Sequence, residues 1–241
     1  MSGHSKWHKI QHAKGKTDKA RSSMFTKLLR SISVTAEQGT DPDMNFALRL
    51  AVEKAKAANV PKDNITRAIL RGSGQDKDAS IFESILYEGF GPGGVAILVD
   101  AFTDNKNRAI AEVKLAFSKH GGSVGGPGSV QWQFSHLGVV RFFTPVTTVA
   151  NWDEIELALI DAGVLDIRAD EEEGELLCPI DKLQAVLEVV TAAGLTPDQY
   201  GLEWVPKETV SIATEIQEQL DGLRNALEEL DDVRDMYTNA E

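Results

Sequence analysis

Apolar residues recur every three to four positions in the first third of the chain, which is the period of amphipathic helices. The pattern predicts helices over 18–39, 41–59 and 61–72. Asp41 can cap the second helix, and Pro42 at its first position loses no hydrogen bond. Short connections between the three helices indicate a small bundle, and a polar linker at 73–78 marks the first domain boundary.

The apolar period shortens after residue 80, where the chain alternates as strands do. The pattern predicts strands over 85–87 and 95–102, a helix over 105–119 and a half-buried strand over 130–134. Two glycine-rich segments separate these elements. A strand follows each of them, whereas a phosphate-binding loop leads into a helix, so 89–94 is interpreted as a hairpin turn and 121–128 as a flexible loop. Backbone contact of the second loop with a polyanion remains an alternative.

The next 70 residues predict strand, helix, strand, strand, helix and strand, which is the ferredoxin-like order βαββαβ. The tail predicts a strand over 209–212 and a helix over 213–236. The middle segment lacks one strand and one helix, and the tail supplies both, so we expect the βαββαβ unit to be inserted into a discontinuous middle domain. The fold class is α+β, with a three-helix domain followed by two ferredoxin-like domains. The predicted domains are 1–77, 78–136 joined with 204–241, and 137–203.

Charge divides the chain into two parts. The 241 residues have a net charge of −12, but residues 1–77 hold 15 Lys and Arg against 7 Asp and Glu, a net of +8. Residues 78–241 hold 10 against 30, a net of −20. An asymmetry of this size indicates a polyanionic partner at the N-terminal end.

Candidate catalytic and metal-binding groups are sparse. The single cysteine, Cys178, excludes an intrachain disulfide and fits a cytoplasmic compartment, and an isolated thiol in an apolar strand is typical of a core. The acidic run 170–175 lacks the ligand spacing of a calcium loop. No apolar run approaches the length of a membrane span. We therefore expect no enzyme activity, cofactor, metal, membrane contact or small-molecule substrate, and we expect a monomer.

The basic N-terminal arm, residues 1–17, and the helix that follows it carry the strongest functional signal. Residues 1–30 hold eight cationic side chains, one acid and three of the five histidines. Cations can contact phosphates, and an indole can stack on a base. The alternative is a solvated tail whose tryptophan packs on the bundle. The candidate nucleic-acid-binding residues are Lys6, Trp7, Lys9, Lys14, Lys16, Lys19, Arg21, Lys27 and Arg30.

A second candidate is a helix-turn-helix formed by the second and third predicted helices. The connection is short, and the third helix carries Lys62, Asn64, Arg67 and Arg71. A plain helical hairpin is the alternative, and the short third helix favours it.

Several long motifs resemble the YebC/PmpR family, and the likeness extends over essentially the whole chain. The motifs are Ser2-Gly3-His4-Ser5-Lys6-Trp7, Asn59-Val60-Pro61-Lys62-Asp63-Asn64-Ile65, Tyr87-Glu88-Gly89-Phe90-Gly91-Pro92-Gly93-Gly94-Val95-Ala96, Thr103-Asp104-Asn105-Lys106-Asn107-Arg108 and Phe117-Ser118-Lys119-His120-Gly121-Gly122. The resemblance implies a three-domain α+β protein without cofactor or catalytic residues. It also implies a DNA-binding transcriptional regulator, or a translation factor that acts on the ribosome at proline-rich stalls.

Two functions thus remain open: a DNA-binding transcriptional regulator, and an RNA- or ribosome-binding translation factor. The family's usual description favours transcription, whereas the lack of a convincing recognition helix favours shaped RNA. A third possibility is an adaptor that uses the acidic C-terminal helix to bind a protein.

Overall fold

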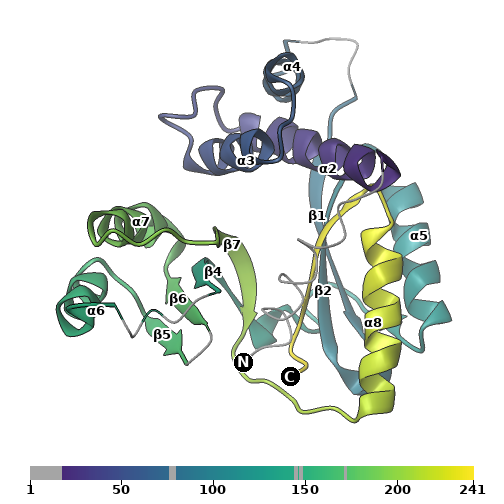
Figure 1. Ribbon diagram of the computed structural model, residues 1–241. Helices are drawn as coiled ribbons and strands as arrows, with labels where there is room; N and C mark the ends of the chain where they lie inside the picture. The colour runs from purple at the N-terminus through teal and green to yellow at the C-terminus, as the bar shows by residue number, and fades with distance from the viewer. Residues whose placement is uncertain (1–17, 76–79, 144–145, 147–148, 171–172) are drawn as a thin grey trace. The chain divides into compact units, whose positions relative to one another are not determined.

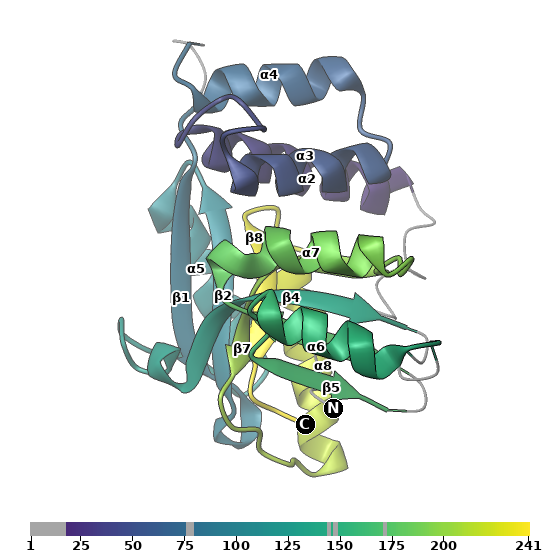
Figure 2. The ribbon, with the colours of Figure 1, turned by 90° about the vertical axis from the view of Figure 1, so that its left-hand side faces the viewer.

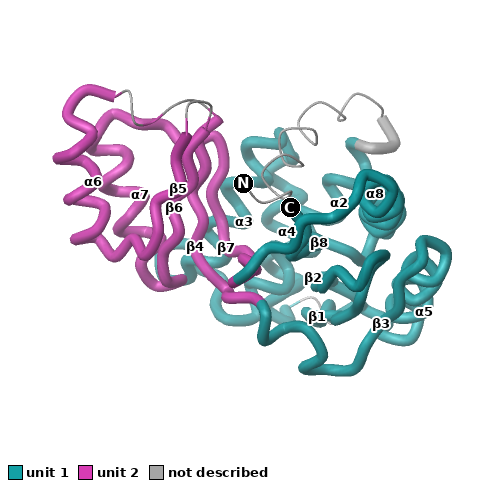
Figure 3. Tube along the Cα trace, turned by 90° about the horizontal axis from the view of Figure 1, so that it is seen from below, with its two compact units in different colours: residues 1–133, 208–241 teal, residues 134–207 magenta. Residues whose placement is uncertain are grey.

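The computed structural model describes residues 18–241 except 76–79, 144–145, 147–148 and 171–172 (Figure 1). The chain forms two compact units, 1–133 with 208–241, and 134–207 (Figure 3). The first contains the helical region and a four-stranded sheet, and the second contains another four-stranded sheet. The expected α+β class, with N-terminal helices and two sheets, is confirmed.

The helical region consists of α2 (Asp18–Ala36), α3 (Phe46–Ala57) and α4 (Lys62–Gly72). The expected cap at Asp41 is wrong, because Asn45 caps α3 instead. Its side-chain oxygen accepts the Leu48 amide at 3.0 Å, and its side-chain nitrogen donates to the carbonyls of Thr35 and Gly39. One buried amide thus closes the α2–α3 turn and starts α3.

Helix α4 packs closely against α2. The Ser33 hydroxyl donates to the Ala68 carbonyl at 2.9 Å, and a Cβ added at Gly72 would lie 2.0 Å from the Ser33 carbonyl oxygen. The lack of a side chain at Gly72 therefore allows the backbones of α2 and α4 to approach closely, and Gly72 also ends α4. The apolar core of this region contains Ile32, Ala36, Leu48, Ala51, Val52, Ala55, Val60, Ile65 and Ala68.

The first sheet has the strand order β3-β1-β2-β8, with all pairs antiparallel. Its strands are β1 (Glu83–Phe90), β2 (Ala96–Thr103), β3 (Ser123–Val124) and β8 (Val233–Thr238). The short 3-10 helix η1 (Pro92–Gly94) turns β1 into β2, which confirms the predicted hairpin.

Two helices, α5 (Lys106–Lys119) and α8 (Thr214–Glu228), lie side by side on one face of this sheet (Figure 1). Their buried side chains share one core with those of β2 and β8. That core contains Val95, Ile97, Val99, Val113, Ala116, Phe117, Leu220, Leu223, Leu227, Val233, Met236 and Ala240.

The tail differs from its prediction. Helix α8 ends at Glu228 instead of continuing to Met236, and a strand follows it rather than preceding it. Residues 209–212 contribute an isolated bridge from Val210 to Ala240 and no regular strand. The resulting order β1-β2-α5-β3, then α8-β8, is no cyclic shift of βαββαβ. The three-residue spacing of Val233 and Met236 fits a helix, and in a regular strand it would place them on opposite faces. A register shift in the pairing of β2 with β8, between Asp100 and Ala101, lets both side chains join the core.

A buried carboxylate, Asp232, joins three elements of the first unit. It lies between α8 and β8 and is 4% exposed. The Arg30 guanidinium of α2 donates to its Oδ1, and Arg108 of α5 donates to both oxygens, at 3.0 and 2.8 Å. The Thr103 hydroxyl at the end of β2 donates to Oδ2 at 2.9 Å. Hydrogen bonds to Asp232 and to Asp104 raise the pKa of Arg108 above its ordinary value.

A second buried carboxylate, Glu88 of β1, organises the segment after β3. It accepts the backbone amides of Gly128, Val130 and Gln131, the last two at 2.8 and 2.7 Å. Burial would raise the pKa of Glu88, but the three amide donors outweigh burial and hold it below the usual value. The predicted strand over 130–134 is therefore wrong, because these amides are not available to a ladder. Residues Gln131–Gln133 form a 3-10 helix instead.

The second unit has the expected ferredoxin-like order (Figure 2). Its elements are β4 (Phe134–Phe142), α6 (Trp152–Asp161), β5 (Asp166–Ala169), β6 (Gly174–Cys178), α7 (Leu183–Ala192) and β7 (Gln199–Pro206). The sheet has the order β5-β6-β4-β7 and is antiparallel throughout. Helices α6 and α7 cover one face of it. The three predicted domain boundaries stay a prediction.

We predict that Asp232→Asn lowers the free energy of unfolding by about 3 kcal/mol, because the half-buried Arg30 loses its counter-charge at a buried site. Denaturant unfolding followed by circular dichroism measures this. The control is Asp104→Asn, which removes the solvent-accessible i,i+4 partner of Arg108 and should cost about 0.5 kcal/mol. Equal losses in the two variants would contradict the central role of Asp232.

We predict that Glu88 makes the stability of the protein sensitive to acid. Because its folded pKa lies below the ordinary value of about 4.3, its contribution is complete above that value and is lost as pH falls through the folded pKa. At neutral pH the free energy of unfolding of the wild type should be about 2 kcal/mol higher than that of Glu88→Gln, because Gln accepts the three amide hydrogen bonds more weakly. The difference should shrink below about pH 4. Urea unfolding across pH measures it, and a pH-independent difference would contradict it.

Candidate nucleic-acid interface

The structure describes only some of the predicted binding residues. Lys6, Trp7, Lys9, Lys14 and Lys16 lie outside the described residues. Lys19 lies on α2, but its side chain is also outside the description. Arg21 is exposed near the start of α2, and its guanidinium lies 5.4 Å from the centre of the Phe25 ring. The described cation nearest the arm is therefore at the surface.

Lys27 and Arg30 have partners inside the protein. Lys27 Nζ donates to the Glu228 carbonyl at 2.6 Å, and burial lowers its pKa, against the opposing effects of Asp235, Glu228 and Asp231. Arg30 binds Asp232 and packs on the Phe82 ring at 5.2 Å. These two cations hold α2 against the corner between α8 and β8. Whether they also contact a nucleic acid stays a prediction.

A third contact completes this attachment of α2. The Ser23 hydroxyl donates to the Asp231 carboxylate at 3.1 Å. With Lys27 and Arg30 it forms a row on one side of α2, at spacings of four and three residues, that meets the end of α8 and the start of β8. The row fixes the position of α2 relative to the first sheet.

Exposed cations also occur on α3 and α4. Lys56, Lys62, Arg67 and Arg71 are all exposed. Arg67 donates to the Asn64 side chain at 2.8 Å, and Arg71 lies 5.8 Å from the centre of the Phe82 ring. The side chains of α4 that would face a groove are thus partly held by their own helix, which supports the plain helical hairpin over a base-reading helix.

The second glycine-rich segment is not built as a phosphate cradle. The amides of Gly128, Val130 and Gln131 already hold the Glu88 carboxylate, so an anion from outside would have to displace it. The Gly125 amide donates to the Glu88 carbonyl at 2.8 Å. This loop is fixed by four hydrogen bonds to a single residue of β1, where a flexible loop was expected.

Sequence reasoning missed Asp232 and Glu88. Asp232 was assigned to the charged end of a helix, and nothing in its local pattern shows that Arg30 and Arg108 meet there. Glu88 offers a weak signal, since it is a carboxylate in an otherwise apolar strand just before a glycine-rich turn. A charge at such a position needs a buried partner.

The remaining chemical candidates are structural. Cys178 is fully buried, and burial raises the pKa of its thiol to about 11, with a smaller effect of Asp181, which confirms a core thiol. Within the described ranges, no three His, Cys, Asp or Glu side chains gather as a metal site. No described helix is long and apolar enough to cross a membrane.

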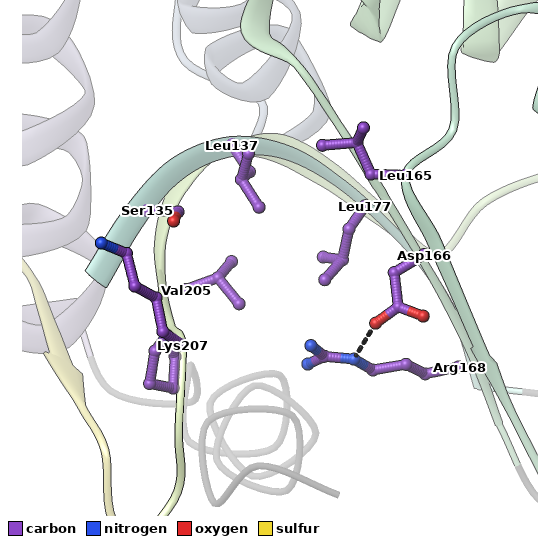
Figure 4. Close-up of a pocket in the computed structure, with 9 residues that line it drawn as sticks. Ser135, Leu137, Leu165, Asp166, Arg168, Leu177, Val205 and Lys207 are labelled. Atoms are coloured by element: carbon purple, nitrogen blue, oxygen red, sulfur yellow. Dashed lines mark hydrogen bonds and ion pairs between the residues drawn. The ribbon is translucent and has the colours of Figure 1, made fainter. Parts of the chain in front are cut away.

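One small cavity of about 190 Å³ lies in the second unit (Figure 4). Gly138 and Cys178 face Leu183 of α7, so their neighbours Leu137 and Leu177 point to the opposite, helix-free face of the sheet. There they line the cavity with Leu165 and Val205, while Asp166 and Arg168 pair across its rim at 2.7 Å. Most of the lining is apolar, with Ser135 and Lys207 on the side opposite Asp166 and Arg168. These side chains form no recognisable catalytic arrangement.

The same sheet face carries a buried ion network. Arg141 of β4 is 4% exposed and donates to Glu175 at 2.8 Å and to both oxygens of Glu203 at 2.7 and 2.8 Å. Burial would lower its pKa, but Glu203 and Glu175 outweigh burial and raise it. The cation is neutralised within the sheet and is not available to a phosphate.

Comparisons with known proteins agree over the full length. The model of the TACO1/YebC N-terminal domain matches residues 5–75, and that of the TACO1/YebC second and third domain matches residues 82–240. A probable transcriptional regulatory protein of Chloroflexus aggregans is 44% identical over 99% of this chain and 95% of its own length. A protein of the same description from Thermoanaerobacter pseudethanolicus is 42% identical over 100% and 97%.

A solved structure also has this fold. The crystal structure of a conserved hypothetical protein from Aquifex aeolicus superimposes with a TM-score of 0.81 at 38% identity, covering 95% of this chain and 93% of that one. Both family models and relatives above 40% identity thus cover the three regions described above. On this evidence the chain belongs to the TACO1/YebC family, whose members in the comparison are named probable transcriptional regulatory proteins.

Proposed function

We propose that this chain is a nucleic-acid-binding regulatory protein, most simply a DNA-binding transcriptional regulator. The supporting observation is the separation of charge: +8 on residues 1–77 and −20 on the rest. A body of that charge repels a polyanion, which favours contact on the N-terminal side. The names of the relatives support the same reading.

The arm is the proposed contact element. Lys6, Lys9, Lys14 and Lys16 neutralise phosphates, and Trp7 stacks on a base or sugar. Lys19 and Arg21 continue this cationic series into the first turns of α2. Lys27 and Arg30 contribute chiefly by fixing α2, through Glu228 and Asp232, so that the series starts from a defined position.

The alternative is a ribosome- or rRNA-binding translation factor that helps at proline-rich stalls. The favouring observation concerns α4, whose Arg67 is bound by Asn64 and whose apolar side packs against α2. Readout of DNA sequence needs side chains that reach base edges in the major groove, whereas structured RNA is recognised by shape and by unpaired bases. A cationic arm suits the second task without a recognition helix.

Crosslinking in cells, followed by sequencing of bound DNA and RNA together, separates the two functions. Enrichment of promoter DNA supports the regulator, and enrichment of one defined rRNA region supports the translation factor. Recovery of neither, with efficient crosslinking of a known nucleic-acid-binding protein in the same cells, would contradict both and favour the adaptor hypothesis.

We predict that binding depends on salt through the arm. If about half of the eight cations in residues 1–30 contact phosphates, log K against log salt should have a slope of about −3 to −4. Changing Lys6, Lys9, Lys14 and Lys16 together to Gln should remove most of this slope. It should weaken binding to nucleic acids of unrelated sequence equally, because phosphate contacts do not specify sequence. Fluorescence anisotropy at several salt concentrations measures it.

The matched control changes four exposed cations of the acidic part, Lys106, Arg168, Lys182 and Lys207, to Gln. The net charge then changes equally, but the arm is intact. Similar losses in both variants would show a general charge effect and would contradict the arm as the binding element.

A further inference from the structure

We propose that Trp132 forms a stacking platform for an unpaired base, at a place separate from the arm. This rests on the proposed nucleic-acid-binding function and adds a second contact that distinguishes single strands from duplexes. The platform comprises Trp132 with the segment Gly126–Gln131 that supports it.

The indole of Trp132 is both exposed and oriented. Its side chain is 67% exposed, on the 3-10 helix Gln131–Gln133. Its ring N–H donates to the Ser129 carbonyl at 3.2 Å, which limits rotation of the ring. A large aromatic side chain held at the surface in a fixed orientation is typical of binding sites, because little conformational entropy is lost when a partner stacks on it.

Hydrogen bonds to a buried carboxylate hold the segment that precedes Trp132 in place. The buried Glu88 carboxylate holds the amides of Gly128, Val130 and Gln131, and the Val130 side chain is fully buried. On the other side, the Gln133 side-chain oxygen Oε1 accepts a hydrogen bond from the Asn239 side-chain amide at 3.2 Å. Burying a carboxylate is unfavourable unless it is fully hydrogen-bonded, so this arrangement serves to fix the loop.

The charge around the platform suits a polyanion. Residues 78–241 contain 30 Asp and Glu, yet the stretch from Val113 to Gln133, which lies in the same compact unit as Trp132, contains none. The same stretch contains Lys114 and Lys119, which are both exposed on α5. Glu88, the carboxylate beneath the loop, is 5% exposed and is covered by amide donors. A phosphate backbone meets less repulsion here than an average surface of this acidic part would give.

The loop before Trp132 leaves space for a flat ring such as a base. Gly126 and Gly128 carry no side chains, and the positions where their Cβ atoms would lie have no atom within 4 Å. The exposed side-chain amide of Gln131 precedes Trp132 and can pair with a base edge. Stacking on an indole requires an accessible base face, which single strands offer and duplexes do not.

The experiment measures the affinity of the full chain for an unstructured single-stranded RNA of about 12 nucleotides and for a DNA duplex of equal length. Trp132→Ala should weaken single-strand binding about 5- to 150-fold and leave duplex binding and the salt slope unchanged. Trp132→Phe should retain most of the affinity, because a ring remains. The control Leu115→Ala removes another exposed apolar side chain of the same acid-free stretch, 54% exposed on α5, and should change neither affinity.

A spectroscopic measurement reports on Trp132 directly. In protein labelled with 5-fluorotryptophan, the 19F resonance lost in Trp132→Phe should shift on addition of the single strand and stay in place with the duplex. If wild type binds the single strand but neither the affinity of Trp132→Ala nor this resonance changes, the platform is wrong and the proposed function stands. If wild type binds neither probe, the proposed function itself fails.

Discussion

The attachment of α2 to the first sheet depends on a single buried carboxylate, Asp232. Arg30, Arg108 and Thr103 converge on it from α2, α5 and β2, elements that lie more than 100 residues before it in the chain. Because Asp232 is almost fully buried, each of its oxygens needs a donor. Arg108 and Thr103 supply donors to both oxygens from the sheet region, and Arg30 adds one from α2. The position of α2 is thereby coupled to formation of the sheet.

This coupling gives the cations of α2 two roles. Lys27 and Arg30 point toward the corner between α8 and β8 and are used for attachment, whereas Arg21, two residues before Ser23, is exposed. A run of cations that looks uniform in sequence is therefore divided by the helix surface.

Glu88 plays a comparable part at the other side of the sheet. It is a second buried acid in a strongly acidic protein, and its partners are backbone amides rather than cations. Amide donors fix a loop without adding charge. Asp232 thus helps to fix α2, and Glu88 fixes the loop that carries Trp132.

Sequence alone was sufficient for the elements whose apolar period is regular: the three N-terminal helices, the β1–β2 hairpin and the ferredoxin-like order of the second unit. It also located the charge asymmetry, because charge needs no fold. It failed where a distant residue chooses between local conformations. The spacing of Val233 and Met236 favours a helix, but pairing with the edge of β2 makes this segment a strand with a register shift. The alternating pattern from Val130 to Phe134 favours a strand, but Glu88 binds the amides of Val130 and Gln131. Such choices are made by long-range hydrogen bonds and buried charges, which have no periodic trace in the sequence.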